Sequence, residues 1–131
     1  MNQGIYLSDS VLDVSGTLAR LGGDKELYGD LMEFCLIDAP QCFGQLQRAV
    51  EMEDAGQAKF HAHSLKGLVA GCGGFRAAGA AQQVEHAAQT GDFDDLKPLM
   101  DSLQKELESL QQAIADCRTK INAASLSDHP R

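Results

Sequence analysis

The apolar residues of this 131-residue chain recur mainly at the three- and four-residue spacing of amphipathic helices. The clearest stripe lies near the end of the chain, where large aliphatic residues follow at intervals of four, four, three and four: Leu99, Leu103, Leu107, Leu110 and Ile114. No repeated strand pattern interrupts the helical spacing. The pattern therefore predicts an all-α protein, and the short connections favour an antiparallel four-helix bundle with a short extra N-terminal helix.

Capping residues and glycines divide the chain into five predicted helices. Their expected ranges are 10–21, 24–53, 54–72, 75–90 and about 94–121. Asp24 and Asp54 are suited to cap the second and third helices, and either Asp94 or Asp95 is suited to cap the last one. Because every segment outside these helices is short, we expect one domain over residues 1–131, with flexible ends at 1–7 and 122–131.

Two prolines fall inside the predicted helices. Pro40 should interrupt or kink the second helix, or start a new one, because proline removes a hydrogen-bond donor and clashes with the preceding turn. Pro98 should be tolerated because it would lie in the first turn of the last helix.

Apolar stripes in the second and third helices predict the rest of the core. The second helix is expected to bury one face that carries Leu27, Leu31, Phe34 and Cys35 and then Phe43, Leu46 and Val50. The third helix presents a narrow seam of small and apolar residues, namely Ala58, Ala62, Leu65, Val69 and Cys72. That seam must face the core, as must the aliphatic stripe of the last helix.

The third helix also carries the residues best suited to chemistry. His63 points well away from the apolar seam, while Lys59 lies one helical turn before it and Lys66 one turn after it, on the same side. A neutral imidazole is a good nucleophile near neutral pH, and a neighbouring ammonium group can neutralise a phosphoryl group during its transfer. Gly67 and Ala70 leave space beside the imidazole, and a glycine inside a helix costs about 1 kcal/mol relative to alanine, which a structural role alone explains poorly.

The five residues from His63 to Gly67 read His-Ser-Leu-Lys-Gly, which resembles the phosphorylation motif of histidine phosphotransfer (HPt) domains. Three flanking segments resemble that family in the same order: residues 18–24 with a Gly-Gly-Asp turn, residues 34–40 ending in Asp-Ala-Pro, and the Gly-Asp turn at 91–92. The resemblance covers roughly residues 12–115.

This resemblance implies a phosphorelay carrier. His63 would accept a phosphoryl group on Nε2 from a phospho-aspartate of a response-regulator receiver domain and pass it to another receiver, Lys66 would contact the phosphoryl oxygens, and Gly67 would provide clearance. In some members a Glu or Gln on the following helix binds the accepting histidine. Glu85 is the expected counterpart, with Gln82 and His86 as alternatives.

The resemblance also implies the partners, namely receiver domains and a hybrid sensor histidine kinase. No cofactor is expected on this chain, because the receiver would supply the Mg²⁺. The sequence contains no Gly-rich nucleotide-binding box, so we expect no ATP-dependent kinase activity of its own. Whether the chain stands alone or belongs to a larger kinase is left open.

The composition argues against several other classes of protein. Lys and Arg number 11 against 19 Asp and Glu, a net charge of −8, so the chain lacks the basic footprint of a nucleic-acid or anionic-membrane binder. The four cysteines form no CxxC pair, and no signal peptide or membrane-spanning segment is evident. We expect a cytoplasmic monomer.

Two functions other than a phosphorelay carrier are compatible with a helical bundle. A metal-binding bundle would use His61, His63, Glu85 and His86, but the Glu-x-x-His pairs of di-metal bundles are missing. An adaptor that binds receivers without being phosphorylated remains the main alternative. Residues around His63 would form the partner-binding surface: Lys59, Phe60, Ala70 and Gln82. Phe60 could instead pack against a neighbouring helix.

Overall fold

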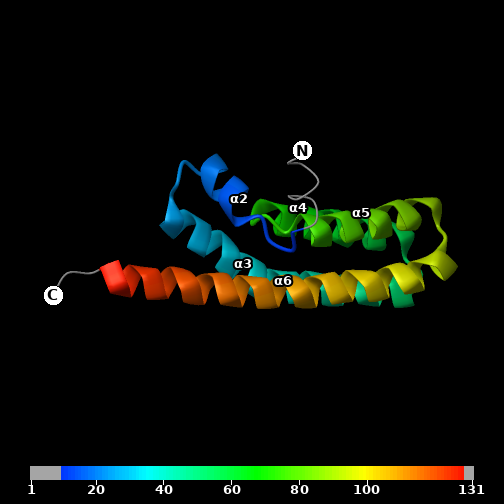
Figure 1. Cartoon of the computed structure of the whole chain (residues 1–131). Helices are drawn as coiled ribbons and strands as arrows, with labels where there is room; N and C mark the ends of the chain where they lie inside the picture. Colours follow the sequence, from blue (N-terminus) through cyan, green and yellow to red (C-terminus); the bar gives the residue numbers. More distant parts are fainter. Residues whose placement is uncertain (1–9, 129–131) are drawn as a thin grey trace, which may run out of the picture.

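The computed structural model describes residues 10–128, and the side chains of residues 10–120. It contains five helices and, within those residues, no strand: α2 (Val14–Arg20), α3 (Lys25–Glu51), α4 (Ala55–Gly71), α5 (Phe75–Thr90) and α6 (Phe93–Asp128). Helices α3 to α6 form an antiparallel bundle in which α4 packs between α3 and α5, and α6 packs against α5 and α3 (Figure 1). The prediction of an all-α bundle with a short extra N-terminal helix is confirmed.

The core contains the seam that was predicted for α4. All five seam residues are buried: Ala58, Ala62, Leu65, Val69 and Cys72. On α6, the predicted stripe is buried except for Leu99, which is half-buried, and two further residues of that helix, Leu96 and Met100, join the core. The spacing of apolar residues therefore identified the inward faces of both helices.

The stripe predicted for the first half of α3 is only partly correct: Cys35 is buried and Leu31 is half-buried. Leu27 and Phe34 are exposed. The inward face lies one residue further along the helix and carries Tyr28, Met32, Cys35 and Ala39. Both sets have helical spacing, so the sequence pattern alone did not distinguish them. The structure selects the second set because it faces the buried seam of α4.

Several helix starts are defined by acidic caps. Asp24 and Asp54 act as predicted, because their carboxylates accept hydrogen bonds from the amides of Leu27 and Gln57 at 3.0 and 3.1 Å. The first helix is shorter than predicted and begins at Val14, because Asp13 caps it by accepting from the amide of Gly16.

The last helix begins earlier than predicted. Asp92 accepts a hydrogen bond from the amide of Asp95 at 3.1 Å, so Asp92 is the cap, and Asp94 and Asp95 lie in the first turn of α6. In the first turn their negative charges interact favourably with the helix dipole. The helix also continues to Asp128, beyond the predicted end near residue 121. The predicted flexible segment 1–7 and the last three residues of the predicted flexible tail lie outside the described residues.

Neither proline ends a helix. The α3 helix continues through Pro40, so the predicted interruption is wrong. Ala39 and Leu46 on either side of that turn are buried, and tertiary packing of this kind stabilises a helix more than one lost hydrogen bond destabilises it. Pro98 lies in the second turn of α6 rather than the first, because that helix starts at Phe93.

The short helix α2 docks on the turn between α4 and α5. Gly73 in this turn has φ +97°, and its carbonyl accepts a hydrogen bond from the amide of Asp13 at 2.9 Å. A side chain at Gly73 would collide with the hydroxyl of Thr17 and the carbonyl of Asp13. The same end of the bundle is closed by Tyr28, whose buried hydroxyl donates to the carbonyl of Cys72. None of the helices in residues 10–128 is long and apolar enough to cross a membrane.

Candidate functional site

His63 lies near the middle of α4 on the face opposite the buried seam. Its side chain is 67% exposed, although its helical neighbours Ala62 and Leu65 are fully buried. The outward orientation that the helical spacing predicted is therefore the one observed. An exposed imidazole at this position can be approached by a second protein.

Glu85 on α5 contacts the imidazole. Its Oε2 atom lies 3.1 Å from Nδ1 of His63. Since a carboxylate only accepts hydrogen bonds, this contact favours the ring form that carries its proton on Nδ1. Nε2 is then unprotonated, and its lone pair is available to an electrophile.

Lys66 completes a three-residue cluster with these two side chains. Its Nζ atom lies 3.0 Å from Oε1 of Glu85, so each oxygen of the carboxylate faces a different partner. The sequence predicted Lys66 close to His63, but it did not predict the ion pair with Glu85. The Glu85 side chain is only 15% exposed, against 28% for Lys66.

Glu85 is ionised at neutral pH in this setting. Partial burial raises the pKa of its carboxyl group, but the ion pair with Lys66 and the hydrogen bond with His63 lower the pKa by more. The net result is a pKa below the ordinary value for glutamate. The carboxylate is thus a permanent hydrogen-bond acceptor for the imidazole.

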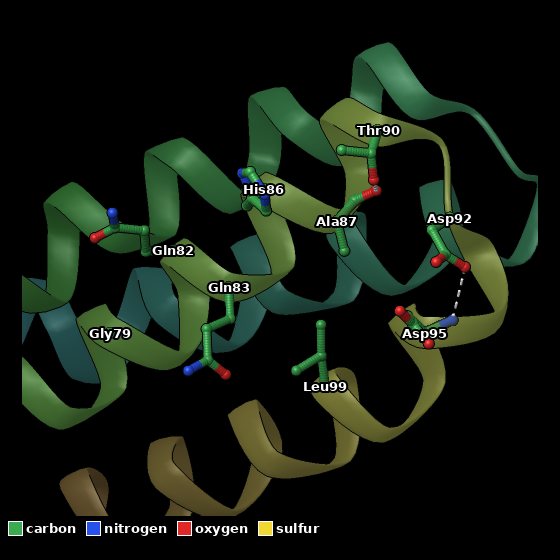
Figure 2. A pocket seen from close by; sticks show the side chains of 9 residues that line it. All are labelled: Gly79, Gln82, Gln83, His86, Ala87, Thr90, Asp92, Asp95 and Leu99. Atoms are coloured by element: carbon green, nitrogen blue, oxygen red, sulfur yellow. Dashed lines mark hydrogen bonds between the residues drawn. The ribbon is translucent and has the colours of Figure 1, made fainter.

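The close approach of α4 and α5 brings Glu85 within reach of His63. The two helices pack closely, and the buried residues of both include many small side chains: Ala58 and Ala62 on α4, and Ala77, Ala78, Ala81, Ala87 and Ala88 on α5. Small residues at a contact allow the helix axes to come near each other. The two other candidates on α5, Gln82 and His86, are exposed. They line a groove of about 740 Å³ between α5 and α6 (Figure 2).

The surface around His63 is open. Gly67 is exposed, and a Cβ atom added to it would meet no atom within 4 Å. Ala70, one turn further along, is half-buried, and Lys59 is exposed. Phe60 is 61% exposed, and its ring meets the edge of His61 with a centroid distance of 5.2 Å. The alternative in which Phe60 packs into a neighbouring helix is therefore wrong.

The structure also reveals an exposed aromatic residue that the sequence placed in the core. Phe34 on α3 is 56% exposed. Its helix faces α4 through Cys42, whose thiol donates to the carbonyl of His61. At 3.6 residues per turn, Phe34 lies about 80° around the helix from Cys42, on the outer border of the α3–α4 contact. No signal in the sequence separated this residue from the buried stripe beside it.

Metal binding finds no support in the part of the chain whose side chains are described. No group of three or more His, Cys, Asp or Glu side chains within it is arranged to hold a metal ion. The charged cluster at His63 contains two potential ligands, His63 and Glu85, and the third member is a lysine.

Comparison with known proteins identifies the family and the fold. The sequence model of the Hpt domain matches residues 30–113. The structure is similar to histidine-containing phosphotransfer protein B (HptB) from Pseudomonas aeruginosa PAO1, with a TM-score of 0.78 and 20% identity over 86% of this chain and 97% of that one. It is also similar to the HPT domain of a sensor hybrid histidine kinase from Shewanella, with a TM-score of 0.74 and 21% identity over 87% and 97% of the two chains. No curated protein matches the sequence. The family match covers more than half of the chain, which therefore belongs to the Hpt domain family, the phosphotransfer domains of two-component phosphorelays.

Proposed function

We propose that the protein carries a phosphoryl group on His63 between receiver domains of response regulators. The observation that carries this proposal is the orientation of His63: the imidazole is exposed, and its Nδ1 atom faces the Glu85 carboxylate at 3.1 Å. The remaining nitrogen, Nε2, is the nucleophile. Receivers and a hybrid sensor histidine kinase are the proposed partners.

The transfer moves one phosphoryl group and no proton. The Nε2 lone pair attacks the phosphorus of a receiver's aspartyl phosphate, a P–N bond forms, and the P–O bond breaks with its electrons returning to the aspartate carboxylate. The Nδ1 proton stays in place, so the ring becomes positively charged as the new bond forms. The Glu85 carboxylate stabilises that charge through its contact with Nδ1. The reverse reaction delivers the group to a second receiver.

Two neighbours of His63 complete the proposed site. Lys66 would neutralise charge on the phosphoryl oxygens, because its flexible ammonium group lies one helical turn from His63 on the same face. Gly67 would leave room for the partner's active site, since no atom occupies the space where its side chain would lie. The Mg²⁺ of the reaction would be held by the acidic pocket of the receiver, so this chain needs no cofactor of its own.

The docking surface is proposed to surround His63. On α4 it includes Lys59, Phe60 and Ala70, and Gln82 would extend it across α5. An exposed aromatic side chain near an interaction site can supply apolar contact area to a partner. Phe34 adds such a residue on the α3 side of the same surface.

A label-transfer experiment tests the proposal. The purified protein would be mixed with ³²P-labelled phospho-receivers from the same cell, and wild type would be compared with His63→Gln. We expect acid-labile, base-stable label on the wild type and none on the variant. If no receiver transfers label although binding is detected, the protein is an adaptor that binds receivers without accepting a phosphoryl group. Equal labelling of the variant would instead overturn His63 as the acceptor.

The proposal includes a monomer in the cytoplasm without kinase activity. Its bundle encloses its own apolar core, so folding does not require a second copy. Incubation with labelled ATP and Mg²⁺ alone should leave the protein unlabelled. Labelling under those conditions would contradict the carrier assignment.

A further inference from the structure

The two oxygens of Glu85 are shared between the proposed phosphoryl acceptor and the lysine beside it. Oε2 faces His63 Nδ1 at 3.1 Å, and Oε1 faces Lys66 Nζ at 3.0 Å. The carrier function proposed above requires Lys66 at a second place, beside the phosphoryl oxygens. One ammonium group cannot occupy both places fully.

We propose that Glu85 and the phosphoryl group compete for Lys66, so that the lysine is held by Glu85 before transfer and moves to the phosphoryl group afterwards. This inference rests on the proposed carrier function of His63. It makes Glu85 a positioning residue with two successive cationic partners.

The position of Lys66 allows this movement. Lys66 follows His63 by three residues on α4, and side chains at that spacing are neighbours on a helix surface. The lysine has a long flexible stem, whereas Glu85 is mostly buried at the α4–α5 contact. The ammonium group can therefore turn toward His63 while the carboxylate stays in place.

The charge changes of the reaction favour the movement. The attacking imidazole must be neutral, because only an unprotonated Nε2 has a free lone pair, and Lys66 then supplies the positive charge that stabilises the partly buried Glu85 carboxylate. After transfer the imidazole ring itself is positively charged, and its Nδ1–H points at the same carboxylate. Glu85 thus gains a cationic partner at the moment when the phosphoryl oxygens attract Lys66. Neither the carboxylate nor the phosphoryl group is left without a positive charge.

The competition has a measurable consequence for the equilibrium of phosphotransfer. In the wild type, Lys66 contributes to the equilibrium constant of phosphotransfer only through the difference between its interaction with the phosphoryl group and its interaction with Glu85. When Glu85 is replaced by glutamine, the resting lysine is no longer held by a charge. Removal of the lysine should then reduce the phosphorylated fraction by a larger factor than it does in the wild type.

A double-mutant cycle tests this. The equilibrium constant between one phospho-receiver and the full-length protein would be measured for wild type, Lys66→Met, Glu85→Gln and the double variant. We expect Lys66→Met to lower the constant in both backgrounds, with a factor at least about threefold greater in the Glu85→Gln background. Circular dichroism of all four proteins confirms that the bundle is folded.

Lys59→Met is the matched control, because Lys59 lies one turn before His63 on the exposed surface. It should change the constant by the same factor in both backgrounds. If Lys66→Met leaves the wild-type constant unchanged, or if its effect is equal in the two backgrounds, the competition is overturned while the carrier function stands. If wild type accepts no phosphoryl group from any receiver or from phosphoramidate, both proposals fail.

Discussion

Glu85 Oε2 lies 3.1 Å from Nδ1 of His63, although the two residues are 22 positions apart and belong to different helices. The contact orients a ring that is otherwise two-thirds exposed. An exposed histidine without a partner would sample both neutral ring forms and many orientations. The carboxylate favours the ring form that carries its proton on Nδ1, and this form leaves the lone pair of the outward nitrogen free.

The ionisation of Glu85 should depend on Lys66. Because Lys66 and His63 together lower the Glu85 pKa by more than partial burial raises it, we expect its carboxyl group to titrate below the ordinary value in the folded protein. Lys66→Met should raise this pKa, and Lys59→Met should leave it unchanged. A ¹³C NMR titration of the side-chain carboxyl carbon measures both effects.

The lowered pKa of Glu85 makes the free energy of unfolding depend on pH. A carboxyl group whose folded-state pKa is lowered stabilises the fold above its unfolded pKa, and this contribution is lost as the pH falls through the folded value. The contribution of Glu85 should therefore disappear in the acidic range below the ordinary glutamate pKa. If the unfolding free energy of wild type and of Glu85→Gln falls in parallel throughout that range, this linkage is absent.

Substitutions at Gly67 should affect stability and the rate of phosphotransfer differently. Its Cβ position is open and the residue lies inside a helix, so Gly67→Ala should raise the free energy of unfolding by about 0.5–1 kcal/mol. Gly67→Leu should leave the protein folded but slow phosphotransfer about tenfold or more, because the side chain would occupy the approach to His63. Denaturant unfolding and label-transfer kinetics measure the two effects.

Gly44 provides the control for that experiment. It also lies inside a helix and has open space at its Cβ position. It follows Glu33 by 11 residues, about three helical turns, so both residues lie on the same face of α3. On that face Glu33 pairs with Arg118 of α6. Gly44→Ala should give a similar gain in stability, and Gly44→Leu should not change the transfer rate. Equal slowing by both leucine variants would show that Gly67 has no special place in the approach to His63.

Phe34 should contribute to receiver binding. Phe34→Ser removes an exposed aromatic side chain from the border of the α3–α4 surface, and we expect the Kd for a receiver to rise about tenfold. Ile37→Ser is the matched control, because Ile37 is 51% exposed and lies about 60° around α3 from Phe34, in the direction of Glu33, which pairs with Arg118 of α6. Binding would be measured by isothermal titration calorimetry, and labelling by phosphoramidate should be unchanged in both. A larger loss for Ile37→Ser would place the receiver on the other side of α3.

Gly73 should be essential to the docking of α2. Gly73→Ala combines a left-handed backbone with a collision against Thr17 and Asp13, and should lower the free energy of unfolding by about 2 kcal/mol or more. Gly22→Ala isolates the backbone effect, because Gly22 has φ +69° and open space around it, and should cost about 1 kcal/mol. Thermal and denaturant unfolding compare the two. Equal losses would mean that the collision is relieved at no cost.

Local sequence determined much of the fold and the choice of the candidate site. The seam of α4, the caps Asp24 and Asp54, and the outward direction of His63 were predictable, because each depends on residues within one or two helical turns. The His-Ser-Leu-Lys-Gly motif singled out His63 by its resemblance to a known family. These features need no information about how one helix is placed against another.

The tertiary structure decided everything that depends on the relative placement of helices. In α3, two adjacent faces have apolar residues at helical spacing, and only packing against α4 selected Tyr28 and Met32 over Leu27 and Phe34. On α5, Glu85, Gln82 and His86 were all candidates. The rotation of α5 directed Glu85 toward His63, while Gln82 and His86 are exposed and line the groove between α5 and α6. The ion pair between Lys66 and Glu85 arose in the same way, because the distance between two side chains on different helices is set by packing and not by the sequence of either helix.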